Sequence, residues 1–165
     1  MLRTIHDFLE TWAEESTITR KLFGSLTEDS LAQEVVPGGR TIGRIAWHLT
    51  VSLGDLTHRL GWAIDCPTKE GEVPPLATIV AIYERAAASL AETVRDEWTD
   101  DDLARVFDIF GERWTGAQSL EMLLRHEVHH RGQLTVLMRQ AGLAVPGVYG
   151  PAREDWAQWG MAAPA

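Results

Sequence analysis

Cysteine is nearly absent from this sequence: Cys66 is the only one among 165 residues, so no internal disulfide can form. The chain has no run of about 18 apolar residues, and its first residues lack the uninterrupted apolar core of a signal peptide. It also has no Pro/Gly/Ser-rich stretch long enough to separate two domains, and no internal repeat. We therefore expect one domain, residues 1–165, in a cytoplasmic protein independent of membranes, with Cys66 as a loop thiol.

Basic side chains are also scarce relative to acidic ones. The 15 Lys and Arg residues against 24 Asp and Glu residues give a formal net charge of -9. A chain with this charge is repelled by phosphate backbones and by anionic lipid surfaces. We therefore expect a small-molecule substrate and no nucleic-acid partner.

Four segments carry the apolar spacing of amphipathic helices, and 45% of the residues are hydrophobic, which is enough for a single core. The first helix is expected to begin at Thr4, with Asp7 three residues later, and to weaken near Leu26. The second follows the expected N-cap Thr41 and ends near Gly61. Both segments have a polar capping residue directly before their apolar stripe, which favours a helix at each.

The third expected helix follows Pro74 and Pro75 and ends around Trp98. The fourth begins with a capping pattern at Thr115 and runs to about residue 140. About sixteen residues lie between these helices, and the β-branched and aromatic residues among them are typical of a short hairpin or an extended crossover. A connection this long can span a bundle, so the predicted fold is all-α: a four-helix bundle with a long crossover between helices three and four.

Two histidines four residues apart, His126 and His130, lie within the fourth helical pattern. Four residues advance a helix by a little over one turn, so both imidazoles project from one face about 6 Å apart and can bind one cation. They also continue the apolar stripe of this helix, where an unpaired polar ring is costly to bury. We interpret them as metal ligands; the alternative is a helical interaction protein in which they are hydrogen-bonded core residues. His129 is expected beside the site or on the surface.

Zinc, nickel and iron sites generally take at least three protein ligands, so a third must come from elsewhere. His48 lies at the edge of the apolar stripe of the second helix, three residues after Ile45 and one before Leu49. His58 shares less of that stripe, and His6 stands in the first turns of the chain, where a solvated or capping role is ordinary. The pattern therefore favours His48 as the third ligand.

A histidine early in the second helix is thus followed about 80 residues later by His-x-x-x-His-Arg-Gly-Gln and then by the tail Val145-Pro146-Gly147-Val148-Tyr149-Gly150-Pro151. This arrangement resembles the DinB-like (DinB/YfiT) family of metal-binding four-helix bundles over nearly the whole chain. The resemblance implies that His48, His126 and His130 hold one divalent ion. Three histidines alone do not separate nickel, zinc and iron, and zinc is the default from its availability and ligand preference. Within such a family Gly132 would permit close helix packing, and Gln133 would hydrogen-bond to a ligand.

The resemblance also implies thiol-dependent transferases and isomerases that use bacillithiol or mycothiol, and hydrolases. We therefore predict a metal-dependent S-transferase or isomerase acting on small molecules with a low-molecular-weight thiol. A metal-dependent hydrolase and a non-catalytic metal-binding stress-response protein are the alternatives. The segment from His126 to His130 further satisfies the zincin pattern, with Glu127 as general base and Glu154 as a conceivable third ligand. That interpretation is weaker, because the chain has little strand to align a peptide.

Seven tryptophans are many for one small domain. Packing in the core and at its rim is the ordinary explanation. Trp47 precedes His48 and is the best candidate for an aromatic wall beside a metal, while the tail with Trp156 and Trp159 is expected to pack over one end of the bundle. The apolar area that these residues suggest also predicts a symmetric homodimer.

Overall fold

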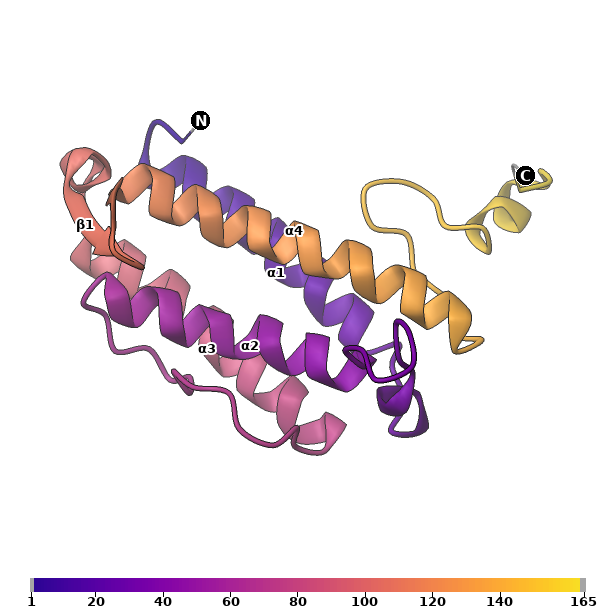
Figure 1. Cartoon of the computed structure of the whole chain (residues 1–165). Helices are drawn as coiled ribbons and strands as arrows, with labels where there is room; N and C mark the ends of the chain where they lie inside the picture. Colours follow the sequence, from indigo (N-terminus) through magenta and orange to yellow (C-terminus); the bar gives the residue numbers. More distant parts are fainter. Residues whose placement is uncertain (1, 164–165) are drawn as a thin grey trace.

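The structure, a computed structural model, describes residues 2–163 and is a bundle of four long helices (Figure 1). The predicted all-α four-helix bundle is confirmed. The helices are α1 (Ile5–Phe23), α2 (Ile42–Arg59), α3 (Leu76–Glu97) and α4 (Gly116–Gln140). In the described part of the chain, no helix combines the length and the apolar character needed to cross a membrane.

Side-chain caps fix where three of the helices begin. The Thr4 hydroxyl accepts a hydrogen bond from the Asp7 amide at the start of α1, and the Asp7 carboxylate accepts one from the Thr4 amide. Thr41 caps α2, and Thr115 forms a reciprocal capping box at the start of α4. Each cap satisfies a helix N–H group that otherwise has no partner and contributes about 1 kcal/mol. The predicted starts of these helices are confirmed.

The segment between α2 and α3, residues 60–75, runs back along α2 toward its beginning (Figure 1). The Cys66 thiol donates to the carbonyl of Thr50 at 3.2 Å, and farther along the Arg44 guanidinium donates to the carbonyl of Gly71 at 3.0 Å. A Cβ atom at Gly54 would lie only 2.3 Å from the Pro67 carbonyl oxygen, so the absence of a side chain lets the segment lie directly on the helix. This segment is called the crossover below.

Because the crossover returns to the start of α2, helices α2 and α3 run parallel, and α1 and α4 run in the opposite direction (Figure 1). The predicted position of the spanning connection, between helices three and four, was therefore wrong. The chain after α3 instead forms a short 3-10 helix, Asp100–Ala104, and a hairpin of β1 (Val106–Ile109) and β2 (Glu112–Thr115). Most residues between α3 and α4 belong to these local elements, so this connection does not cross the bundle. Helix α4 therefore begins at the end of the bundle where α3 stops.

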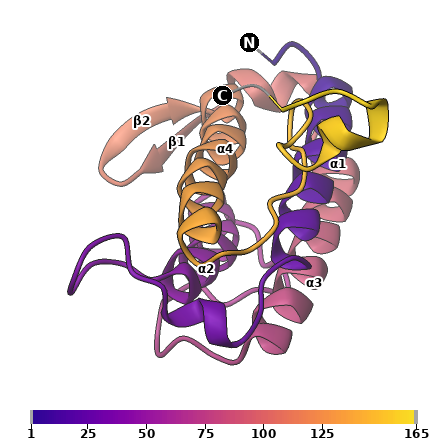
Figure 2. The ribbon, with the colours of Figure 1, turned by 90° about the vertical axis from the view of Figure 1, so that its right-hand side faces the viewer.

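The hairpin lies beside α4, on the side away from α1 (Figure 2). Its strands pair antiparallel, from Val106 with Thr115 to Ile109 with Glu112. The two residues of its turn, Phe110 and Gly111, both have positive φ angles, of 56° and 81°. The short hairpin that the sequence predicted is confirmed.

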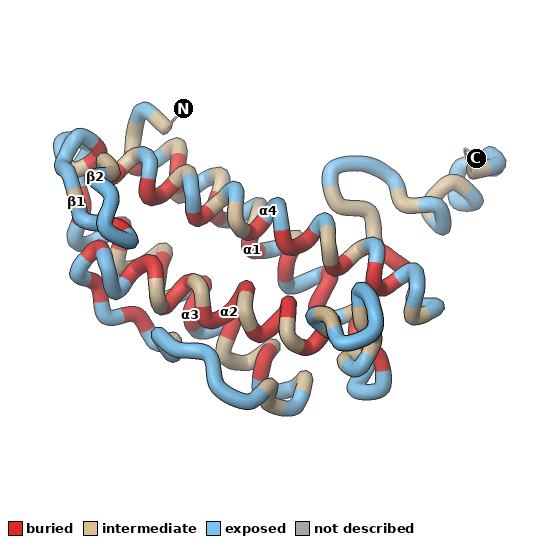
Figure 3. Tube along the Cα trace, in the orientation of Figure 1, coloured by how far each residue is buried: buried red, intermediate tan, exposed pale blue. Residues whose placement is uncertain are grey.

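Buried positions face the interior of the bundle along all four helices (Figure 3). Phe8 and Trp12 stack within α1, and the Trp12 indole N–H donates to the carbonyl of Ala87 in α3 at 3.0 Å. The ring of Phe23, at the end of α1, meets Tyr83 of α3 edge-on. This core holds α1 against α3 and leaves α2 beside α4, so that residues of these two helices face each other.

The tail after α4 does not pack over an end of the bundle. Its short 3-10 helix, Asp155–Trp159, has no buried residue and stands away from the four helices (Figure 1). The tail is attached nearer its start, where the Tyr149 hydroxyl donates to the Glu15 carboxylate at 2.7 Å and the Gly147 carbonyl accepts from Lys21. The predicted packing of Trp156 and Trp159 was therefore wrong, because buried Val145 and these polar contacts, rather than the tryptophans, attach the tail.

The location of Cys66 beneath the crossover leads to a test of how firmly that segment is packed. Burial raises the pKa of the Cys66 thiol to about 11, so very little thiolate is present at pH 8. We expect the folded protein to react with Ellman's reagent more than about a hundredfold more slowly than free cysteine, because the thiolate is the reacting form. Unfolding in urea should release one fast-reacting thiol per chain. Fast labelling of the folded protein would contradict this packing.

Candidate metal centre

The antiparallel contact of α2 with α4 brings His48, His126 and His130 together. One ring nitrogen of each lies within 4.8 Å of those of the other two. The Nε2 atoms of His126 and His130 are 3.1 Å apart, and the His48 ring centre lies 4.6 Å from that of His130. The three residues that the sequence analysis selected therefore form one cluster that could hold a metal ion.

Hydrogen bonds behind two of the rings fix their tautomers. The Nδ1 atom of His48 faces the carboxylate of Glu70, and Nδ1 of His130 lies 2.8 Å from Oε1 of Gln133. Because both partners only accept there, each Nδ1 carries the proton and donates it. The Gln133 amide is oriented this way because its nitrogen donates to His129 at 3.2 Å. The Nε2 atoms of His48 and His130 therefore carry lone pairs rather than protons, as metal ligation requires, and that of His130 lies 3.1 Å from Nε2 of His126.

The surroundings of the cluster favour neutral imidazoles. Burial and the neighbouring histidines lower the pKa of His126 to about 3. Burial likewise lowers the pKa of His130 to about 4, although the hydrogen bond with Gln133 opposes that shift. At neutral pH these two rings therefore present lone pairs to a common space. Nitrogen donors from three histidines beside a cavity fit a divalent transition metal with an open position.

Glu70 was missed by the sequence analysis, and it belongs to the site. The residue lies in the crossover, and Arg44 holds it from the other side at 3.1 Å. Partial burial acts to raise the Glu70 pKa, but hydrogen bonds from His48 and Arg44 outweigh it and lower the pKa. Glu70 lies in a loop, outside any helical or strand pattern, so the sequence alone gives no sign that its carboxylate has a role. Only the path of the crossover shows that this carboxylate reaches His48.

Of the other residues considered from the sequence, Gln133 has the expected contact with the cluster, and the remaining histidines lie outside it. Gln133 makes the expected hydrogen bond to a histidine of the cluster, whereas Gly132 faces open space and serves no close packing. His129 is exposed and lies outside the cluster, as expected. His6 and His58 are also exposed, and His6 pairs with Glu10 at 3.3 Å.

Glu127 lies on the opposite side of α4 from the cluster. Its carboxylate is 1% exposed and accepts hydrogen bonds from Thr19 of α1 and, at 2.9 Å, from Tyr83 of α3. Burial raises the Glu127 pKa to about 7. Glu154, in turn, is paired with Arg139. The zincin interpretation therefore fails, because neither its general base nor its third ligand faces His126 and His130.

Arg131 is buried on this same rear side of α4, with 1% exposure. Its guanidinium forms an ion pair with Glu15 of α1 and also contacts the hydroxyl of Tyr149. A buried charge is stable only with such partners, so this pair fixes α4 against α1 and attaches the tail to both. The sequence pattern gives no sign of this pair, since Arg131 occupies a position typical of a surface residue.

Two cavities flank the cluster along the α2–α4 contact. The smaller, of about 240 Å³, is lined by His48 and His126 together with Leu56 and Phe110. The larger, of about 590 Å³, lies on the other side and is lined by Gln133, Val136 and the loop before α2. Trp47 is buried and borders neither cavity, so the predicted aromatic wall was wrong.

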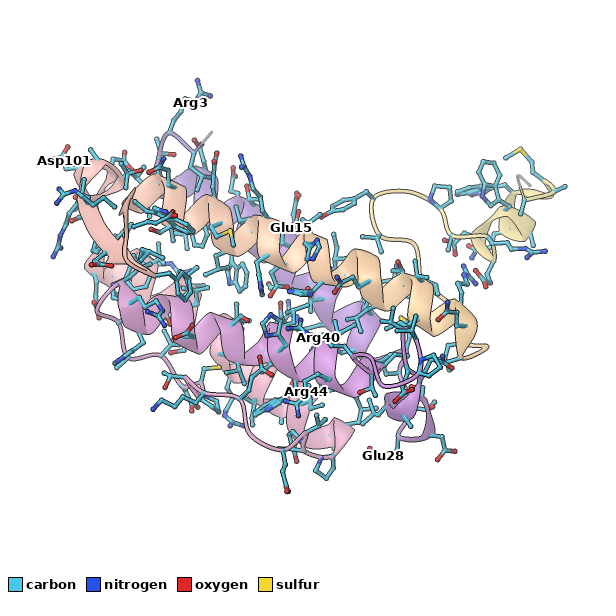
Figure 4. The ribbon with its side chains drawn as sticks, in the orientation of Figure 1. Arg3, Glu15, Glu28, Arg40, Arg44 and Asp101 are labelled. Atoms are coloured by element: carbon cyan, nitrogen blue, oxygen red, sulfur yellow. The ribbon has the colours of Figure 1, made fainter. Side chains whose placement is uncertain are left out.

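Arg40 belongs to the lining of the larger cavity. Figure 4 shows it beside the middle of the α2–α4 pair. Its positive charge is near enough to contribute to the lowered pKa of both His126 and His130. The larger cavity is thus suited to a ligand that carries negative charge.

Comparison with known proteins places these features in a wider group. The sequence profile of the DinB family matches residues 1–161. YrdA of Bacillus subtilis is 41% identical over 165 residues, which covers 99% of each chain. YjoA of the same organism is 31% identical over 84 residues, covering 45% of this chain and 54% of its own.

Solved structures agree with the fold. A DinB-like protein from Bacillus cereus ATCC 10987 is 42% identical, with a TM-score of 0.87 over 90% of this chain and 100% of its own. The structure of YjoA, at 21% identity, has a TM-score of 0.67 over 86% of this chain and 96% of its own, and it supports the fold alone.

The hydrogen bond from His48 to Glu70 can be tested against a matched neighbour. Removing the carboxylate in Glu70→Ala frees the ring to rotate and to change tautomer, so zinc affinity should fall about ten- to a hundredfold. Glu72→Ala removes an exposed carboxylate from the same crossover and should leave the affinity unchanged. Competition with a chromophoric chelator measures both. Equal affinities in the two variants would show that Glu70 does not support the site.

Proposed function

The chain belongs to the DinB family, and we propose that it is a metal-dependent enzyme that transfers a small thiol to an electrophilic substrate. In this proposal His48, His126 and His130 hold one divalent ion. The observation that carries it is the convergence of one ring nitrogen from each histidine, with two tautomers fixed, between two cavities.

A bound divalent ion would supply a Lewis acid that lowers the pKa of a thiol or water, and three neutral imidazoles leave its charge undiminished. The residues of the chain would orient the ligands, limit the access of water and bind the co-substrate. Glu70 and Gln133 hold two of the rings in orientation, and the apolar walls of the smaller cavity limit the access of water. Arg40 supplies positive charge in the larger cavity, where it would hold the anionic part of a co-substrate.

The presence of a cavity on each side of the cluster favours a reaction of two substrates over hydrolysis, which needs room for one substrate and a water. A hydrolase of this kind generally uses a carboxylate as general base beside the metal. The best-buried carboxylate of α4, Glu127, faces α1 and α3 instead. Hydrolysis is therefore the second candidate, and a non-catalytic metal-binding protein the third.

Metal content is the first test of the proposal. Protein made without a polyhistidine tag should contain about one divalent ion per chain by elemental analysis. His48→Ala, His126→Ala and His130→Ala should each lose most of it, because two imidazoles bind zinc too weakly to retain it. His6→Ala and His58→Ala are the controls and should keep the full amount. Less than about a tenth of an ion per chain, with no thermal stabilisation by added zinc, would end the metal proposal.

The type of reaction is tested with two model assays on the metal-loaded protein. Thioether formation from monobromobimane and a panel of small thiols should be accelerated, and His126→Ala should abolish the acceleration. Hydrolysis of p-nitrophenyl acetate without added thiol should remain near the background rate. The reverse result would favour the hydrolase. Activity in neither assay, with metal bound, would favour the non-catalytic alternative.

A further inference from the structure

The turn of the hairpin contains a backbone conformation that its sequence does not favour. Among residues 2–163, Phe110 is the one non-glycine residue with a positive φ, 56°. With Gly111 it forms a two-residue connection in which both residues are left-handed, as in a type I′ turn. Asn, Asp or Gly is preferred at the first of these positions, and a bulky aromatic residue is strained there. The hairpin itself would be more stable with another residue.

Burial of the Phe110 ring does not offset this strain. The residue is 57% exposed, so the ring does not join the core. The Arg59 guanidinium lies over one face of the ring, 4.1 Å from its centre, and Arg59 is held in turn by Asp55 at 3.2 Å. A residue that breaks a local rule without a gain in packing is expected at a functional position.

The cavity beneath the ring connects Phe110 to the histidine cluster. The same space of about 240 Å³ is lined by Phe110 and by both His48 and His126. Its remaining walls are largely aliphatic, from Leu53 and Leu56 of α2 and Met122 and Leu123 of α4. The volume is smaller than that of sites for whole drug-sized molecules, about 300–1,000 Å³, so it suits one group of a substrate.

We propose that this cavity binds a planar apolar group of the electrophilic substrate, such as an aromatic ring, and that Phe110 selects it. The assignment rests on the proposed function, because it takes the three histidines as the place where the substrate reacts. An aromatic group in the cavity stacks on the face of the Phe110 ring that Arg59 leaves open. The polar, reacting end of the substrate then lies at His48 and His126.

The test compares imidazole with 4-phenylimidazole as ligands of the cobalt-loaded protein. Both share the same metal-binding ring, so the ratio of their dissociation constants isolates the phenyl group. In the natural chain 4-phenylimidazole should bind at least about tenfold more tightly than imidazole, by burying its ring in the cavity. The visible spectrum of cobalt reports the binding of each ligand without any assay of activity.

Phe110→Asn should remove most of this tenfold preference and leave the affinity for imidazole itself unchanged. Because Asn accepts the left-handed conformation, the variant should also melt about 1–3 °C higher. A merely structural Phe110 would give the opposite shift in Tm. Val106→Asn, which also replaces an exposed apolar residue of the hairpin but borders no part of the cavity, should keep the preference.

Each outcome decides between the assignments. If the cobalt-loaded protein binds 4-phenylimidazole no more tightly than imidazole, the proposal that the cavity binds an aromatic group is wrong. The proposal of a metal site is unaffected by that result. A preference that survives Phe110→Asn overturns the role of Phe110, as does a lower Tm of this variant. A natural chain that takes up no cobalt overturns the proposed function, and the pocket assignment with it.

Discussion

The candidate site depends on holding two of its three imidazoles from behind, so that ring nitrogens of all three face one small space. Lone pairs that point at one another repel, and rings free to rotate would turn away. Here His48 is held by Glu70 of the crossover, and His130 by Gln133, one turn farther along its own helix. The crossover therefore does more than connect two helices: its path along α2 determines the tautomer of a histidine in the site.

Helix α4 presents polar groups on two sides, and each side has a separate role. His126 and His130 face α2, while their neighbours Glu127 and Arg131 face the interior toward α1. Displacing α4 would leave a buried carboxylate or guanidinium without partners, which costs several kcal/mol. The charges on the rear side thus keep the helix in one position, and the imidazoles on its other side are placed precisely as a result.

Local features of the chain were predictable, and features created by its path through space were not. The caps at Thr4, Thr41 and Thr115 and the pair His126 and His130 depend on residues within one helical turn of each other. His48 followed from the apolar stripe of its helix. Length, however, does not distinguish a connection that spans the bundle, such as residues 60–75, from one that folds locally before α4. For that reason the position of the crossover was predicted wrongly.

Glu70 and Phe110 were missed for related reasons. Glu70 acts through a tertiary contact that no sequence spacing reveals, although a carboxylate in a loop that returns along α2 is a candidate once the path is known. Phe110 could have been noticed in the sequence, because an aromatic residue directly before a glycine at a predicted hairpin turn departs from the usual Asn or Asp.

The close approach of the crossover to Gly54 has a consequence for the energetics of the site. The segment that supplies Glu70 is packed on α2 by the Cys66 and Gly54 contacts, so the order of the crossover and the orientation of His48 are linked. Linkage is reciprocal: whatever stabilises His48 in its present orientation must hold the crossover closed by the same free energy. A ligand bound at the histidines would therefore protect the loop between Arg59 and Leu76, which contains none of these histidines, against local opening.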